Sequence, residues 1–294
     1  MTFLGIRIDS VSQTIALPPK KLAEIILLIN EWSLKSSCTR TEWQSFIGFL
    51  QFAAKCIPAG RLFTSRLIYV LSLSRGLKFI ALDDQIRLDI LWWKEFLPLW
   101  NGTASFLSIN WTSPLISQLF TDSAASVGFA GCCRGEWFNC RRSEFSPIVI
   151  DVCIELLEMI PIFVACAIWG PQFHCKKILF HSDNLGCVQA WAKLGSSNTA
   201  VLSLMRAMVA LAAKFNFALN IVHIDGISND IADSLSRFQM SRFARLAPNA
   251  RAQSVSVPIS IKKLIAQHLS FPFKLCSSSI VTLPVHHGTP MQPE

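Results

Sequence analysis

Four acidic residues of this chain stand in segments whose order along the sequence would bring their carboxylates together. Asp122 lies in a short strand-like segment, and Glu158 lies in an apolar helical one. Asp183 follows another strand-like segment, and Asp233 lies in a short helical one. Carboxylates that converge from separate elements repel one another unless cations neutralise them. Hard divalent cations such as Mg²⁺ prefer oxygen ligands, and a pair of them can hold both oxygens of an in-line phosphoryl displacement. The residue types therefore point to metal-dependent hydrolysis of a phosphodiester.

The segments that carry these residues change pattern along the chain. Three short apolar segments separated by turn residues predict strands at 118–122, 127–132 and 135–140. Helix and strand patterns then alternate, with helices predicted at 150–169, 184–193, 198–215 and 229–238 and strands at 177–182 and 219–224. Three strands followed by alternating helix and strand predict an α/β fold with a mixed sheet flanked by helices.

Four segments in this order resemble the motifs of type 1 ribonuclease H domains. Thr121–Gly128 resembles the first-strand motif, and Glu158–Gly170 resembles the helix that carries the family's glutamate. His181–Asn184 is similar to the third motif, and His223–Asp233 is similar to the last one. Within this set, Ala232–Arg237 looks most like DIRS-type retrotransposons and their relatives.

The resemblance implies a ribonuclease H-like mixed five-stranded sheet flanked by helices over residues 115–240. The implied activity is Mg²⁺-dependent endonucleolytic cleavage of RNA in RNA–DNA hybrids, and the RNA strand is distinguished by its 2′-hydroxyl. Two Mg²⁺ ions, or Mn²⁺ in their place, would be held by Asp122, Glu158, Asp183 and Asp233. In this resemblance His223 assists proton transfer or product release, and Asn229 helps to order its loop.

The N-terminal part resembles the same kind of element, a reverse transcriptase. Residues 1–17 resemble the last hairpin of the polymerase palm, and residues 18–114 predict a small helical thumb or connection region. Thr39 or Thr41 with Glu42 predicts a helix start, and residues 58–60 predict a helix end. Residues 82–84 resemble the aspartate pair of a polymerase, but they precede a predicted helix, so they are interpreted as helix-start residues and no polymerase activity is expected.

The segment 241–294 is loose in composition and predicts a linker and a poorly ordered C-terminal tail, with an amphipathic stretch at 259–269 that could dock elsewhere. The formal net charge of +8 permits a polyanionic partner. The expected partners are an RNA–DNA hybrid and the polymerase part of a reverse transcriptase. Four basic residues among the predicted helices are candidates for phosphate contacts: Arg61, Arg66, Arg75 and Lys78.

Several site residues have a second interpretation. Glu155 lies one helical turn from Glu158 and competes with it for the role of the family's glutamate. Asp151 and Asp230 are interpreted as helix-start residues, and His223 is alternatively a core histidine. Asp225 stands where the family usually carries proline. The alternative function is a silent or domesticated retrotransposon remnant that binds nucleic acid or protein. An integrase-type nuclease is disfavoured by the last motif.

Composition narrows the class of protein further. Hydrophobic residues make up 51% of the chain and charged residues 16%, which disfavours disorder. The most apolar stretch, Met159–Trp169, is too short to span a bilayer, so no membrane contact is expected. Ten cysteines without a signal peptide predict a reduced, intracellular protein of the cytoplasm or nucleus that is not secreted. Buried thiols are favoured over a zinc site built on His174 and Cys175.

Overall fold

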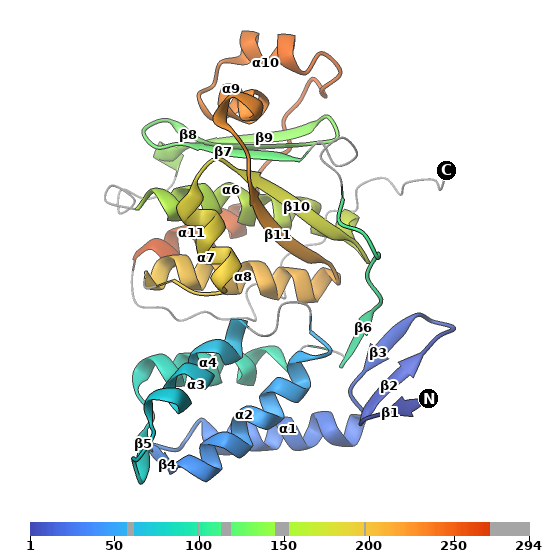
Figure 1. The fold of residues 1–294 in the computed structure, drawn as a ribbon. Coiled ribbons are helices and arrows are strands. Elements are labelled where there is room, and N and C mark those ends of the chain that lie inside the picture. The colour runs from blue at the N-terminus through green and yellow to red at the C-terminus, as the bar shows by residue number, and fades with distance from the viewer. Residues whose placement is uncertain are drawn as a thin grey trace. The chain divides into compact units, whose positions relative to one another are not determined.

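The computed structural model describes residues 1–57, 62–98, 100, 102–112, 119–144, 153–196 and 198–270, with side chains to residue 265. The chain divides into two compact units, Met1–Leu107 and the described residues from Ser108 onward (Figure 1). Several predicted features lie outside the described residues: the helix end at 58–60, Arg61, the strand start at 118, the helix start with Asp151, and the tail from 271.

The first unit begins with a small antiparallel sheet. Its strands follow the order β1 (Thr2–Phe3), β2 (Ile6–Asp9), β3 (Thr14–Ala16) and β6 (Thr103–Ser105). The turn between β2 and β3 is held by the Asp9 carboxylate, whose Oδ1 accepts hydrogen bonds from the backbone of Val11 and Ser12. This local bonding explains why the segment reads as a hairpin in the sequence.

The rest of the described part of this unit contains four helices and a short strand pair. They are α1 (Pro19–Trp32), β4 (Ser37–Thr39), α2 (Arg40–Ala54), α3 (Leu62–Leu73), β5 (Phe79–Ala81) and α4 (Asp84–Phe96). Thr39 and Glu42 form a reciprocal capping box, which confirms the predicted start of α2. The Asp83 side chain accepts a hydrogen bond from the Ile86 backbone at 2.8 Å and caps α4, so its helix-start interpretation is also confirmed.

The predicted basic cluster of this unit is only partly at the surface. Arg75 and Lys78 are exposed. Arg66 instead lies beside the fully buried Asp89, with 3.5 Å between Nε and Oδ2, and donates to Gln85. Moving this guanidinium to a phosphate would leave the buried Asp89 charge without its counter-ion. Phosphate contact by Arg66 therefore stays a prediction, with this cost attached to it.

The second unit is a mixed α/β structure, as the sequence predicts. Strands β7 (Phe120–Ala124), β8 (Gly128–Cys133) and β9 (Glu136–Arg141) form an antiparallel sheet in which Asp122 pairs with Ala130. Strands β10 (Lys177–Ser182) and β11 (Ala218–His223) form a parallel pair in which Ser182 lies opposite His223. The five predicted strands are thus present, but the described backbone pairs them as sheets of three and two strands.

The helices of this unit cover both faces of the strands (Figure 1). They are α6 (Ile154–Trp169), α7 (Leu185–Lys193), α8 (Thr199–Phe215), α9 (Asp230–Ser236), α10 (Met240–Leu246) and α11 (Ile259–Ser270). Helix α6 packs against β7 and β8 on one side and against α8 on the other, while α9 packs on β7, β8 and β9. A helix enclosed on two sides is apolar all round, which explains the composition of α6.

Helix α6 and the 3₁₀ turn after it together form a candidate membrane-spanning segment. By length and composition Ile154–Phe173 is long enough to cross a bilayer, which the shorter stretch Met159–Trp169 did not suggest. However, 83% of its apolar window is buried inside the unit, as expected of the core helix of a folded domain. The length and the apolar composition of Ile154–Phe173 are therefore explained by its packing inside the second unit.

The segment after residue 240 differs from the predicted linker. Phe243 of α10 is buried and meets Trp137 of β9 edge-on, with 5.3 Å between ring centroids. Beyond α10, the backbone N–H groups of Arg251 and Val255 donate to the carbonyls of Gly135 and Trp137 along the outer edge of β9. Helix α11 then docks on α8 and α6. The apolar residues of this segment recur at helical spacing, but Ser and Pro stand between them. The composition of the segment therefore resembles that of a linker.

Candidate metal centre

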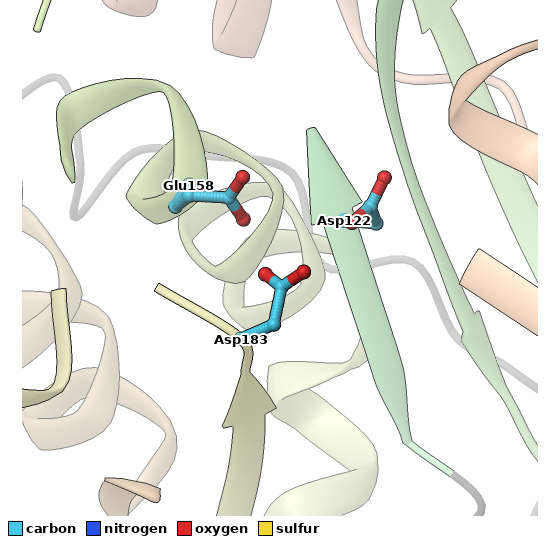
Figure 2. A group of neighbouring side chains, drawn as sticks. All are labelled: Asp122, Glu158 and Asp183. Atoms are coloured by element: carbon cyan, nitrogen blue, oxygen red, sulfur yellow. The ribbon is translucent and has the colours of Figure 1, made fainter. Parts of the chain in front are cut away.

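Three carboxylates meet in the second unit. Asp122 comes from β7, Glu158 from the second turn of α6, and Asp183 from the residue that follows β10 (Figure 2). Each contributes an oxygen atom, and these atoms lie within 4.8 Å of one another. Asp122 and Glu158 are 6% and 7% exposed, whereas Asp183 is exposed to solvent. The group is therefore enclosed by the protein on two sides and accessible from the side of Asp183.

Asp122 is oriented by two residues of the segment that leads into α9 and through it. The Ser236 hydroxyl donates to Asp122 Oδ2 at 2.5 Å. The Asn229 amide donates to the Thr121 carbonyl at 3.0 Å and to Asp122 Oδ1 at 3.4 Å. Asn229 is 1% exposed, so these bonds tie the start of α9 to β7 in a buried place. Fixed hydrogen bonds of this kind hold a carboxylate in one orientation.

The electrostatics of the group disfavour three negative charges. Burial raises the pKa of Glu158 to about 9, and the nearby Asp122 and Asp183 raise it as well. Burial also raises the pKa of Asp122, against the hydrogen bond from Ser236, which lowers it. Removal from water and like charges both penalise the ionised form of a carboxyl group. A bound cation would offset both effects, so the group is suited to hold a metal ion.

Glu155, the rival of Glu158, lies elsewhere. Its side chain packs on α7, where a Cβ built on Gly186 would lie 2.6 Å from Glu155 Cγ. Only a glycine at position 186 leaves room for this approach. The structure therefore brings Glu158, and not Glu155, to Asp122 and Asp183.

Asp233 does not join the three carboxylates, although the sequence predicts four. Its Oδ1 accepts from Arg237 Nε at 2.5 Å, and its Oδ2 accepts from Arg242 Nη1 at 2.8 Å. Partial burial would raise the pKa of Asp233, but the hydrogen bonds and charges of the two arginines lower it overall. Its charge still acts on Asp122, whose pKa it helps to raise. Asp233 thus lies close to the group but is turned to two guanidinium groups.

The remaining predicted residues, His223 and Asp225, are both exposed to solvent. His223 ends β11 and is exposed, so the interpretation as a buried core histidine is wrong. Asp225 is exposed as well and precedes a 3₁₀ turn at Gly226–Asn229, with φ −65° and ψ 138°. These are the angles that a proline ring favours. The backbone at Asp225 therefore has a conformation that a proline at this position could also adopt.

His174 and Cys175, the residues of the alternative zinc site, make other contacts. The His174 ring nitrogen Nδ1 lies 3.1 Å from the Phe215 carbonyl, and Cys175 Sγ accepts from the Asn216 amide at 3.5 Å. Most of the described cysteines are buried, as predicted, and burial raises the pKa of several of them, for example to about 12 for Cys187. These thiols behave as small apolar groups in the core.

Sequence reasoning missed two residues that donate hydrogen bonds to the predicted aspartates: Ser236, which donates to Asp122, and Arg242, which donates to Asp233. Ser236 lies seven residues after Asn229 and three after Asp233, a spacing that places all three near one side of a helical segment. This spacing was available in the sequence. Arg242 lies beyond the last motif and on another helix, so no local pattern connected it to Asp233.

Replacing Ser236 by Ala is expected to lower the affinity of the carboxylate group for Mn²⁺ by about 10–100-fold, as for other residues that orient metal ligands. Without the hydroxyl, Asp122 loses its shortest hydrogen bond, and its pKa rises further. Calorimetric titration with Mn²⁺ measures the change. Ser234→Ala is the matched control, because the buried Ser234 hydroxyl donates to the Ile231 carbonyl of its own helix. Equal affinities in the two variants would contradict the role of Ser236.

Comparison with known proteins adds little to this geometry. No protein-family model matches the chain, and no curated protein matches it. A solved structure of a foamy viral protease-reverse transcriptase, dRH, in complex with double-stranded DNA is similar, with 12% sequence identity and a TM-score of 0.30. The alignment covers 76% of this chain and 37% of the viral chain, so this chain spans little more than a third of that protein's length. Nothing about activity follows from a likeness of this size.

Proposed function

We propose that this chain is a ribonuclease H of retroelement origin, of the DIRS type, which cleaves RNA in RNA–DNA hybrids with Mg²⁺. The observation that carries the proposal is the meeting of Asp122, Glu158 and Asp183 from three separate elements. These elements follow one another in the order of the motifs that the sequence resembles, and in the proposal each carboxylate takes the role of its motif. Converging carboxylates repel one another when two of them are buried, and a bound cation would offset that repulsion.

The strand arrangement supports the same reading. In our proposal the two sheets are halves of one ribonuclease H-like sheet with the order β9-β8-β7-β10-β11. In support, β7 and β10 lie in contact, and the Thr121 hydroxyl donates to the His181 carbonyl at 3.5 Å. The segments 1–17 and 18–114 would then be the palm remnant and the thumb or connection region of the same reverse transcriptase, and its polymerase part would be a natural partner.

The donor set fits a hard divalent cation. All three groups offer oxygen, which Mg²⁺ and Mn²⁺ prefer, and none offers the sulfur or imidazole nitrogen typical of zinc sites. Burial first, and the charges of Asp122 and Asp183 second, raise the pKa of Glu158, which is the state expected of a ligand without its ion. When bound, such an ion supplies an activated water and stabilises the leaving 3′ oxygen.

The protein's own residues have separable tasks in this function. Asp122, Glu158 and Asp183 would bind the metal, and Ser236 and Asn229 would keep Asp122 in its orientation. The imidazole of His223, exposed at the end of β11, would move a proton to or from the leaving group. The open side at Asp183 would admit the hybrid.

Cleavage of a labelled hybrid by the purified chain tests the proposal directly. We expect Mg²⁺-dependent cutting of the RNA strand in an RNA–DNA hybrid, its loss with a chelator, and no cutting of a DNA duplex of the same sequence. Internal products would distinguish an endonuclease from an exonuclease. Intact RNA at all Mg²⁺ and Mn²⁺ concentrations, from a chain that melts cooperatively, would overturn the proposed activity.

The second candidate is a silent remnant that binds nucleic acid or protein without cutting. One observation favours it: Asp233, the fourth carboxylate of the motif set, is engaged by Arg237 and Arg242 and stands apart from the other three. Under this alternative the chain binds hybrids in the presence of Mg²⁺ but leaves the RNA intact. A binding measurement beside the cleavage measurement separates the two candidates.

A further inference from the structure

Both carboxylate oxygens of Asp233 accept hydrogen bonds from arginine side chains. Arg237 comes from the same helical stretch, four residues later, while Arg242 comes from α10. A carboxylate with a guanidinium at each oxygen is already neutralised. The Asp233 side chain is 24% exposed, so water screens this pairing only in part. A metal ion that approached Asp233 would meet two positive charges that are already in place.

Arg242 is held firmly in this position. Besides Asp233, its guanidinium donates to Asp230 Oδ1 at 2.5 Å and to Gln239 Oε1 at 3.1 Å. The next residue, Phe243, is buried in the apolar cluster on the face of β8 and β9. Three acceptors and a buried neighbour fix a side chain that would otherwise sample many rotamers. The contact with Asp233 is therefore a feature of the fold of α10.

We propose that Arg242 is a positioning residue that competes with a second divalent cation for Asp233. In this view Asp122, Glu158 and Asp183 take one ion, and Asp233 serves a second ion only after Arg242 has moved away. The inference rests on the proposed function, in which two ions act together. It adds that α10, a helix outside the motif set, sets the concentration at which the second ion binds.

The opposite effect of Arg242 is also physically reasonable. Hydrogen bonds to a ligating carboxylate often strengthen a metal site by fixing the ligand's orientation. Two observations favour competition instead: each oxygen of Asp233 faces a guanidinium, and Asp233 stands outside the group of three carboxylates. A supporting hydrogen bond would leave one oxygen turned toward the shared ion.

Mn²⁺ binding to the full chain without nucleic acid tests the inference, with free Mn²⁺ measured by electron paramagnetic resonance. We expect the wild-type chain to bind one ion tightly and a second weakly. Arg242→Met, which keeps the apolar stem, should tighten the second ion by about tenfold, equal to about 1.4 kcal/mol, and leave the first unchanged. Arg245→Met is the matched control, since Arg245 is exposed on the same helix, and it should change neither.

The outcomes separate the two proposals. An unchanged or weaker second ion in Arg242→Met, with the first ion intact, would overturn the competition and leave the proposed function standing. No Mn²⁺ binding by the wild-type chain would overturn both. If Arg242→Met does not fold, Arg242→Lys replaces it, because lysine keeps the charge but cannot bridge Asp230 and Asp233. It should tighten the second ion by about threefold, and no tightening would again overturn the inference.

Discussion

Replacing Asp183 by Asn is expected to lower the rate of hybrid cleavage by about 10³-fold or more, with no loss of stability. The loss of rate follows from the proposed function, in which Asp183, the exposed member of the three carboxylates, binds the metal on the side open to the substrate. The fold should hold or gain stability, since the Asp183 charge raises the pKa of both Asp122 and Glu158 in the absence of a cation. Cleavage rates and thermal melting, measured on the same preparation, check both parts.

Asp225→Asn provides the matched control for this variant. Asp225 is an exposed aspartate in the neighbouring loop and does not belong to the carboxylate group. The Asp225→Asn variant also loses one negative charge from an exposed side chain. Its rate of hybrid cleavage should stay close to that of the wild-type chain. Full activity in Asp183→Asn would refute the metal mechanism, while a large drop in its melting temperature would show that Asp183 is structural.

The metal-free chain is expected to lose stability as the pH rises from about 5 to about 9. Burial raises the pKa of Glu158 in the folded chain to about 9, from an ordinary value of 4.5. Between these values the folded state holds a proton that the unfolded state has released, so the free energy of unfolding falls with rising pH. The contribution of this one group is at most about 1.4 kcal/mol per pH unit. Burial also raises the pKa of Asp122, so this residue acts in the same direction.

Thermal melting between pH 5.5 and 8.5 with a chelator present measures this dependence. Glu158→Gln should remove most of the slope and should be more stable than the wild-type chain at the upper end. Glu155→Gln, one helical turn away on the side of α7, should keep the slope. Added Mg²⁺ should stabilise the wild-type chain more at pH 8.5 than at pH 5.5, because it binds the ionised carboxylates. Identical slopes in the wild-type chain and Glu158→Gln would contradict the assignment.

The elements that carry Asp122, Glu158 and Asp183 were predictable because local rules decide them. Short apolar strands between turn residues, and an apolar helix between them, place the three carboxylates in the right order. The choice between Glu158 and Glu155 was not decided in this way. Both lie near the start of α6, and the packing in the fold distinguishes them: the Glu158 oxygen lies within 4.8 Å of those of Asp122 and Asp183, while Glu155 packs against Gly186.

The engagement of Asp233 could not be predicted, for a conformational reason. Helices α9 and α10 are separated by Phe238, whose φ of 58° is a left-handed conformation that a bulky residue rarely adopts. A turn at glycine or asparagine would have been visible in the sequence, but a turn at phenylalanine is not. The bend brings α10 back toward α9 and places Arg242 against Asp233.

The backbone of residues 251–255 along β9 and the ring of Phe243 on its face also bear on the solubility of shortened chains. A chain ended at residue 240, where the motifs end, would leave the carbonyls of Gly135 and Trp137 without their N–H partners and would uncover the apolar face beside them. Open strand edges beside apolar surface recruit other chains and lead to aggregation. Such a chain would keep all the carboxylates and still be expected to precipitate, so the smallest soluble form of the second unit extends well past residue 240.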